Sequence, residues 1–179
     1  MTPKYKVVFA GPVGSGKTTA IQTLSEIEVV QTEAMATDAV RLLKPATTVA
    51  MDYGLMKLAG GEKVHLYGTP GQKRFDFMWD ILTRDALGIV LLIKATAHDP
   101  VDDLRQFCHH FRPFVERNDV VVGVTHTEQA GGDVATALMD ELRQQGAAPR
   151  VMDADARNRK HMATLVESLL FSIKTPHGA

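Results

Sequence analysis

Hydrophobic residues along the chain form two kinds of segment. Some are short, nearly continuous apolar runs, and others carry apolar residues every three or four positions. The first pattern is typical of strands buried in a parallel sheet, and the second is typical of helices with one buried face. The runs predict strands at residues 4–10, 49–58, 64–68, 88–94, 119–124 and 150–152. The periodic segments predict helices at residues 18–26, 75–84, 132–144 and 158–173, with another that begins at Asp99-Pro100.

The alternation of strands and helices predicts an α/β fold, a three-layer sandwich with a mostly parallel six-stranded sheet and helices on both faces. Residues 49–58 and 64–68 flank Gly60-Gly61, a pair that tolerates the backbone angles of a tight hairpin, so we expect one antiparallel edge strand. Residues 28–47 show only a broken pattern, with Pro45 near its end, and are expected to form a loop. The length of 179 residues predicts a single domain over residues 1–179. Ligands are expected at the carboxyl ends of the strands.

The helix that begins at Asp99-Pro100 has a typical start, because an acidic cap precedes a proline at the first helical position. We expect Pro113 to bend it. Cys108 lies on its apolar face and is predicted to be a buried packing residue, not a catalytic thiol. That face comprises Val101, Leu104, Phe107, Cys108, Phe111 and Val115.

The helix at residues 75–84 is more apolar than one buried face requires. One stripe comprises Phe75, Met78, Trp79 and Leu82, and a second comprises Phe77 and Ile81. Tryptophan and phenylalanine on a surface often anchor partner proteins, so this helix suggests a docking surface. Core packing is the alternative explanation.

Composition excludes several classes of protein. The 20 Lys and Arg residues nearly balance the 21 Asp and Glu residues and are scattered along the chain, so no nucleic-acid partner is predicted. No signal peptide and no apolar stretch of membrane-spanning length is visible. Neither common lipidation motif occurs, so we expect no membrane anchor. These features predict a soluble, cytoplasmic protein.

The segment between Gly11 and Thr18 fits the phosphate-binding pattern G-x-x-x-x-G-K-[ST], and it lies between a predicted strand and a predicted helix. Glycines let backbone N–H groups approach phosphates closely, and the helix directs its positive end at the anion. Lys17 would place a charge on the outer phosphates, and the Thr18 hydroxyl would bind Mg²⁺. The predicted nucleotide-binding residues here are Gly11, Val13, Gly14, Ser15, Gly16, Lys17, Thr18 and Thr19.

A second motif, Leu66-Tyr67-Gly68-Thr69-Pro70-Gly71-Gln72, follows a predicted strand. The backbone N–H of Gly71 can contact a γ-phosphate, so its position would change when that phosphate leaves. Gln72 can orient the attacking water in nucleotide hydrolysis. A strand-ending turn with a solvent-facing glutamine remains the alternative.

Together, these motifs resemble the small Ras-like GTPases, in particular a compact bacterial and archaeal branch with Thr-Val-Ala-Met-Asp-Tyr-Gly and Tyr-Gly-Thr-Pro-Gly-Gln-x-Arg-Phe segments. The resemblance runs nearly end to end and implies a small G domain that binds GTP or GDP with Mg²⁺. It implies that Thr48, with Thr47 as the alternative, closes over Mg²⁺ and the γ-phosphate. The implied catalytic residues are Gln72, Lys17 and Thr48, and the implied metal ligands are Thr18 and Thr48.

The chain departs from this family at the metal. The family at large has an acidic residue at the end of its third strand, and here that position is Gly68. Either Mg²⁺ is held by Thr18, Thr48 and the phosphates alone, or a carboxylate such as Asp52 or Asp38 substitutes.

The base-binding motif also departs. The chain has Thr125-His126-Thr127-Glu128 where the family has Asn-Lys-x-Asp. Glu128 keeps a carboxylate for the guanine N1–H and 2-amino groups but reaches one methylene further. His126 would stack on the base or lie in a surface loop. By resemblance, Ala156 presents its backbone N–H to the guanine O6, while Asp155 and Arg157 brace that loop; Asp155 could equally cap a helix.

Val13 stands where the Ras family proper has a glycine beside the γ-phosphate. A side chain there can obstruct Gln72 or an arginine from a partner, so we expect slow intrinsic hydrolysis. Arg74 could point toward the phosphates, although a surface ion pair is the alternative.

The resulting hypothesis is a molecular switch whose GTP state is recognised by partner proteins and whose hydrolysis is stimulated by a partner. The resemblance implies regulators such as a Roadblock-type protein. Two alternatives stay open: a nucleotide-bound scaffold with little hydrolysis, and a P-loop kinase or ATPase.

Overall fold

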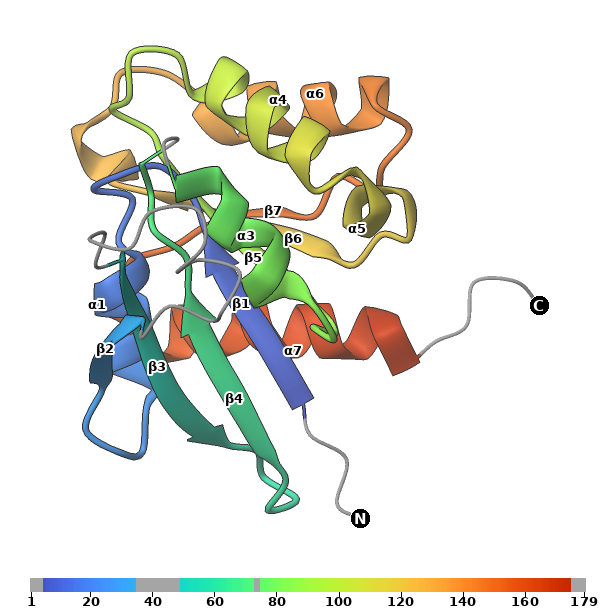
Figure 1. The fold of residues 1–179 in the computed structure, drawn as a ribbon. Helices are drawn as coiled ribbons and strands as arrows, with labels where there is room; N and C mark the ends of the chain where they lie inside the picture. Colours follow the sequence, from blue (N-terminus) through green and yellow to red (C-terminus); the bar gives the residue numbers. More distant parts are fainter. Residues whose placement is uncertain (1–4, 35–48, 73–74, 175–179) are drawn as a thin grey trace.

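The structure is a computed structural model that describes residues 5–34, 49–72 and 75–174 (Figure 1). Within these residues one sheet contains seven strands in the order β2-β3-β4-β1-β5-β6-β7. The strands are β1 (Tyr5–Ala10), β2 (Val30–Ala34), β3 (Val49–Lys57), β4 (Lys63–Gly68), β5 (Gly88–Lys94), β6 (Val120–Thr125) and β7 (Val151–Asp153). The α-helices are α1 (Lys17–Leu24), α3 (Asp76–Thr83), α4 (Pro100–His110), α5 (Arg112–Glu116), α6 (Val134–Gln144) and α7 (Arg159–Lys174), with a 3₁₀ helix η2 (Thr127–Gln129).

Helices cover both faces of the sheet, as Figure 1 shows. Helices α1 and α7 pack on one face, where Ile21, Leu24 and Leu165 belong to one hydrophobic cluster. Helices α3, α4, α5 and α6 cover the other face, where Trp79 and Leu138 join a second cluster. The central strands are apolar on both faces because each face contacts helices, which explains their continuous apolar runs. The predicted three-layer α/β sandwich is therefore confirmed.

The sheet has one strand more than predicted. Strand β2 lies inside the segment 28–47 that we expected to be a loop, and it pairs antiparallel with β3. Strand β3 is also antiparallel to β4, so β3 is the strand that runs against the others, one position in from the β2 edge. Strand β2 contains Gln31, Thr32 and Glu33 and lies at the sheet edge, so backbone pairing with β3 defines it. Such a strand leaves no regular apolar period in the sequence.

Pro113 lies in the first turn of a new helix and does not bend a continuous one. Helix α4 stops at His110, and the short helix α5 begins at Arg112. Proline has no backbone N–H to donate within a helix, so a boundary near Pro113 is less costly than a continuous helix. The predicted start is confirmed, because the Asp99 side chain accepts a hydrogen bond from the Asp102 N–H at 2.9 Å.

The predicted packing role of Cys108 is confirmed. Its side chain is buried in the cluster beneath α4. Burial raises the pKa of the Cys108 thiol to about 12. The thiol therefore stays protonated at neutral pH and lacks the thiolate character of a nucleophile.

The suggested docking surface does not include Trp79, and the alternative of core packing is confirmed for this residue. Trp79 is only 4% exposed and stacks on Phe107, with ring centroids 4.7 Å apart. Phe77 and Ile81 are partly buried against Met78. Core packing explains why this helix is so apolar. Trp79 packs on the aromatic residues of α4, while Phe77 and Ile81 pack on Met78.

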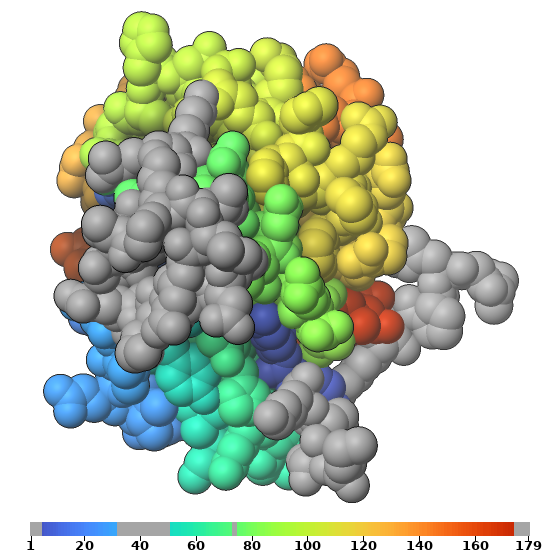
Figure 2. All heavy atoms as spheres, in the orientation of Figure 1, coloured from blue at the N-terminus to red at the C-terminus, as the bar shows by residue number. Residues whose placement is uncertain are grey.

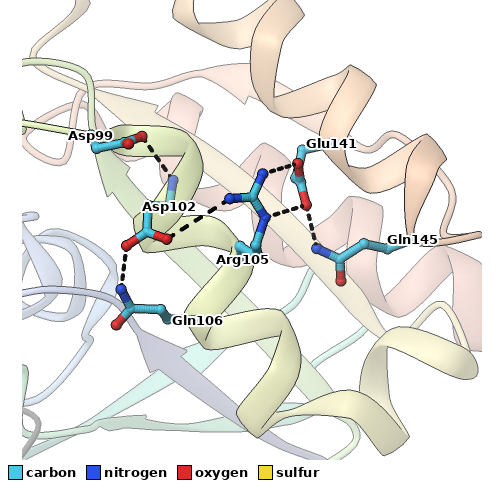
Figure 3. Close-up of polar contacts among 6 residues, drawn as sticks. All are labelled: Asp99, Asp102, Arg105, Gln106, Glu141 and Gln145. Atoms are coloured by element: carbon cyan, nitrogen blue, oxygen red, sulfur yellow. Dashed lines mark hydrogen bonds and ion pairs between the residues drawn. The ribbon is translucent and has the colours of Figure 1, made fainter.

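An ion pair joins α4 to α6 on the surface of the second layer (Figure 3). Arg105 donates from Nε to Glu141 Oε1 at 3.1 Å and from Nη2 to Oε2 at 2.8 Å. Gln145 Nε2 donates to the same carboxylate at 2.8 Å. The side chain of Glu141 is 7% exposed. Hydrogen bonds from Arg105 and Gln145 hold the pKa of Glu141 below its ordinary value.

Replacement of Glu141 by glutamine is expected to lower the free energy of unfolding by about 1–2 kcal/mol at neutral pH, because a charge-assisted bidentate pair is lost. Urea unfolding of the variant and the native protein measures this difference. Glu116→Gln is the matched control, since Glu116 and Arg112 are 64% and 66% exposed, and it should leave the midpoint nearly unchanged.

The difference in unfolding free energy between Glu141→Gln and the native protein is expected to depend on pH. The folded protein lowers the pKa of Glu141, so the ion pair stabilises the fold above the ordinary value of 4.5. This stabilisation is lost as pH falls through the lower pKa of the folded state. A difference between Glu141→Gln and native protein that stays constant from neutral pH to well below 4.5 would contradict the assignment.

No helix among the described residues has the length and apolar character needed to cross a bilayer.

Candidate functional site

A cavity of about 450 Å³ opens beside the N-terminus of α1, between the loops that follow β1, β6 and β7. Parallel strands place these loops at one edge of the sheet, so segments far apart in the sequence meet there. The cavity is lined by Gly14, Gly16, Lys17, Thr18, Thr19, Thr125, His126, Glu128, Gln129, Asp155, Ala156 and Arg157. All of these except Gln129 were predicted from the sequence. Gln129 could have been found from its position, because it directly follows Glu128.

Two glycines explain the shape of the loop before α1. Gly16 caps the helix with φ 103°, and a Cβ there would lie 3.0 Å from the Cβ of Ala156. Gly11 has φ 147°, and a Cβ would lie 2.2 Å from the carbonyl oxygen of Leu92. Side chains at either position would be strained and would clash. The loop can therefore wrap closely and aim the positive end of α1 into the cavity.

Lys17 is buried beneath this loop. Its Nζ donates to the carbonyl oxygens of Gly11 and Pro12, each at 2.7 Å. The residue is 8% exposed. Burial lowers the pKa of Lys17 to about 8, and the Asp52 carboxylate opposes this shift. A cation with little hydration therefore lies at the floor of the site, where an anion would interact with it strongly.

Gly71 also lies against the loop before α1. A Cβ at Gly71 would lie 2.7 Å from the Val13 nitrogen and 2.9 Å from Lys17 Nζ. Only glycine allows this approach, which brings together two segments that the sequence assigned separately to phosphate binding. Gln72 follows immediately and is exposed. Val13 is 64% exposed.

A carboxylate occupies the neighbourhood of Gly68. Strand pairing places Asp52 of β3 opposite Gly68 of β4. A Cβ on Gly68 would lie 3.3 Å from Asp52 Oδ2 and 3.0 Å from Ile21 Cδ1. The Thr18 hydroxyl donates to the same Asp52 oxygen at 2.5 Å. Asp52 thus brings its charge from the adjacent strand into the region where a side chain at position 68 would lie.

Thr125 ties the end of β6 to the phosphate-type loop. Its buried hydroxyl donates to the Ser15 carbonyl oxygen at 2.9 Å. The next residue, His126, adopts a left-handed backbone with φ 59° and places Nδ1 3.1 Å from the Thr125 hydroxyl oxygen. Glu128 lies in η2 with an exposed side chain beside the cavity. The Thr125 hydrogen bond therefore fixes the end of β6, and the residues that follow it, relative to the loop before α1.

The prediction that Asp155 and Arg157 brace their loop is confirmed. The Arg157 N–H and Nε both donate to Asp155 Oδ1 at 2.9 Å, and Nη2 donates to Oδ2 at 2.8 Å. These hydrogen bonds lower the pKa of Asp155 to about 2. The alternative that Asp155 caps α7 is wrong, because Asn158 Oδ1 accepts from the His161 N–H near the start of that helix. Ala156 between them is anchored by the Thr23 hydroxyl, which donates to its carbonyl oxygen at 2.8 Å.

Several predicted residues lie outside the described residues, namely Asp38, Thr47, Thr48 and Arg74. Within the part of the chain that the structure describes, no group of three or more His, Cys, Asp or Glu residues converges as a metal site. The single carboxylate at Asp52, together with the Thr18 hydroxyl, is what the described residues offer to a cation beside the loop.

The sequence model of a family described as conserved hypothetical ATP-binding proteins matches residues 27–170. That match begins after the phosphate-type loop, so Gly11 to Thr18 provide separate evidence. An uncharacterized protein of Methanocaldococcus jannaschii is 26% identical over 135 residues, which cover 75% of this chain and 76% of the relative. The intraflagellar transport protein 22 homologue of Rattus norvegicus is 27% identical over 135 residues, which cover 73% of this chain and 69% of the relative.

Among solved structures, the chain is similar to the G domain of the T. maritima FeoB iron transporter. The TM-score is 0.61 at 17% identity, and the alignment covers 96% of this chain and 98% of that domain. The shared fold is that of P-loop nucleoside triphosphatases, and the cavity lies where the phosphate-type loop, Lys17 and Gly71 meet. The comparisons and the fold together indicate a nucleotide-binding protein.

Proposed function

This chain belongs to the family of conserved hypothetical ATP-binding proteins, and we propose that it is a single-domain guanine-nucleotide switch that hydrolyses GTP slowly. The observation that carries the proposal is the contact of Gly71 with Val13 and Lys17. A terminal phosphate held by Lys17 would lie against Gly71, so its presence or loss would move the Gly71 segment. Such a response to the terminal phosphate is what distinguishes a switch from a simple nucleotide-binding protein.

The phosphates are proposed to bind the loop amides of residues 11–18 and the N-terminus of α1. Lys17 is desolvated, and its carbonyl partners hold it at the floor of the loop, so its charge is available to phosphate oxygens. Preorganised N–H groups and a buried cation stabilise negative charge without reorganisation during reaction. Binding is therefore expected to be tight.

The base is proposed to be guanine, although the family description names ATP. Guanine offers two donors, N1–H and the 2-amino group, to a carboxylate, while adenine offers an acceptor at N1 and lacks the 2-amino group. Glu128 supplies a carboxylate at the cavity wall, and Ala156 lies on the opposite loop, where its N–H would meet the guanine O6. A carboxylate that faces adenine N1 would be repelled, so Glu128 favours guanine.

Magnesium is proposed to bind between the phosphates, the Thr18 hydroxyl and Asp52, with Thr48 added from the family resemblance. Oxygen donors suit this hard cation, and Thr18 and Asp52 already lie within hydrogen-bond distance of each other. When bound, the ion would neutralise phosphate charge. Asp52 would then perform the role that the larger family assigns to an acid at the position of Gly68.

Hydrolysis is proposed to be slow in the isolated protein. Gln72 would orient water, with Lys17 and Thr48 as the other catalytic residues, and Val13 would hinder that arrangement. The rodent relatives are named for intraflagellar transport, which favours a function exercised with other proteins. A Roadblock-type regulator is part of this proposal.

An ATPase is the second candidate function, and the family description favours it. Labelled GDP, GTP, ADP and ATP are therefore titrated into the purified chain. We expect guanine nucleotides to bind at least about tenfold more tightly than adenine nucleotides. A charged hydrogen-bond pair provides a difference of this size. Glu128→Gln should abolish that preference, and Glu167→Gln, an exposed glutamate on α7, should preserve it. Tighter binding of adenine nucleotides by the native protein would establish the ATPase assignment instead.

Replacement of Asp52 by asparagine is expected to weaken Mg²⁺-dependent GTP binding by about tenfold or more, because the cation loses a charged partner. Titration of GTP at several Mg²⁺ concentrations and in excess EDTA measures the effect. Asp140→Asn, in an exposed pair on α6, is the control. The double variant Asp52→Asn/Gly68→Asp should restore Mg²⁺ dependence, since the two positions face each other across β3 and β4. Unchanged Mg²⁺ dependence in Asp52→Asn would refute the role of Asp52.

Phosphate release separates the switch from a nucleotide-bound scaffold and from a kinase. A single-turnover measurement is expected to give slow release of phosphate to water, further slowed in Gln72→Leu. Complete absence of release, alone or with a partner, would favour the scaffold. A rate well above the intrinsic range of about 10⁻⁴–10⁻² s⁻¹ would contradict the proposed hindrance by Val13.

A further inference from the structure

Trp79 connects the Gly71 segment to helix α4. We propose that Trp79 is a positioning residue: its indole N–H holds Gly71 against the phosphate-binding loop, and its ring transmits the nucleotide state to the surface between α3 and α4. This inference rests on the proposed function, because it assigns the element through which the terminal phosphate acts. It concerns a side chain that does not line the nucleotide cavity.

The hydrogen bond of the indole fixes the chain one residue before Gly71. Trp79 Nε1 donates to the carbonyl oxygen of Pro70 at 2.8 Å. Trp79 is 4% exposed, and a buried indole N–H left without an acceptor would be costly. On the other side, the Thr69 N–H donates to the Phe9 carbonyl oxygen of β1 at 2.9 Å. The residues before Gly71 are therefore fastened both to the sheet and to α3.

The indole ring is fastened to α4. It stacks on Phe107 with centroids 4.7 Å apart and an interplanar angle of 23°. His110 meets it edge to face at 4.8 Å and 83°. Phe111 completes the group at 5.6 Å. Because close-packed rings do not slide freely, the position of α4 determines where the Nε1–H points.

A movement of Gly71 would therefore change the packing of Trp79 on α4. Gly71 contacts Val13 and lies close to Lys17, so a terminal phosphate would act on it directly. A shift of the adjacent Pro70 carbonyl either breaks the bond to Nε1 or pulls Trp79 along the face of Phe107. Both outcomes change the packing of α3 on α4 by altering one defined contact.

The ring group borders a second cavity of about 470 Å³, which lies between α3 and α4. Trp79, Phe107 and His110 line it, with Asp76, Arg105, Gln106 and His109 at its other walls. Figure 2 shows α3 and α4 side by side on one face of the molecule. The surface that would change with nucleotide state is therefore this one, and it shares no lining residue with the nucleotide cavity.

The test compares Trp79→Phe with Phe107→Leu in the full chain. Trp79→Phe keeps one aromatic ring but removes the N–H together with part of the indole, whereas Phe107→Leu removes the stacking partner and keeps the N–H. Affinities for GDP and for a non-hydrolysable GTP analogue are measured with Mg²⁺. In Trp79→Phe we expect the affinity for the analogue to fall about fivefold, the equivalent of one hydrogen bond, with GDP affinity unchanged. A purely structural role predicts equal losses for both nucleotides, and that result would overturn the proposal.

Intrinsic fluorescence gives an independent test in the native protein, because Trp79 is the single tryptophan. Addition of the GTP analogue should change the emission of Trp79. The spectrum with GDP should differ from the spectrum with the analogue. Identical spectra with the two nucleotides would overturn the proposal even if Trp79→Phe failed to fold.

The two proposals fail in different ways. A native protein that distinguishes the GTP analogue from GDP, with the same ratio in Trp79→Phe, would refute the role of Trp79 alone. If the native protein binds only adenine nucleotides, guanine specificity fails, and the same ratio is measured with ADP and a non-hydrolysable ATP analogue. Absence of binding by any of these nucleotides would refute both.

Discussion

The buried ammonium group of Lys17 is the interaction on which the arrangement of the site depends. A cation beneath a loop needs acceptors, and the carbonyls of Gly11 and Pro12 supply them. This requirement curves the loop around Lys17, and it leaves room above only for a residue without a side chain, which is Gly71. Gly71 is in turn bound through Pro70 to Trp79 and through Thr69 to β1. One desolvated charge thus links the phosphate-binding loop, the Gly71 segment and α3.

The pairing of β3 with β4 places a carboxylate beside Gly68. Gly68 cannot provide a carboxylate, but antiparallel pairing brings Asp52 opposite it and beside the Thr18 hydroxyl. Asp52 can place its charge near position 68 because cross-strand neighbours share one face of the sheet. A single-residue shift in the register of β3 would turn Asp52 to the other face.

The central strands and most helices were predictable, because continuous apolar runs and helical spacing are properties of residues near one another in the sequence. Strand β2 was not, since its partner β3 defines it and its residues carry no apolar period. The separation of α4 from α5 near Pro113 was not predicted either. Proline lacks a backbone N–H, and tertiary packing decides whether the chain bends or starts a new helix there. Trp79 illustrates the same limit: an apolar side chain looks alike whether a partner protein or α4 covers it.

The residues that line the cavity beside α1 could be predicted almost completely from motifs, since phosphate binding demands glycines, a lysine and a hydroxyl at fixed spacing. The sequence by itself therefore determined the α/β class, the phosphate-type loop and the carboxylate of Glu128 beside the cavity. Only the tertiary structure decided that Asp52 lies beside Thr18, that Gly71 contacts the loop around Lys17, and that Trp79 holds Pro70. These contacts join residues from different strands and helices, and their distances depend on strand register and side-chain packing, which local sequence patterns do not contain.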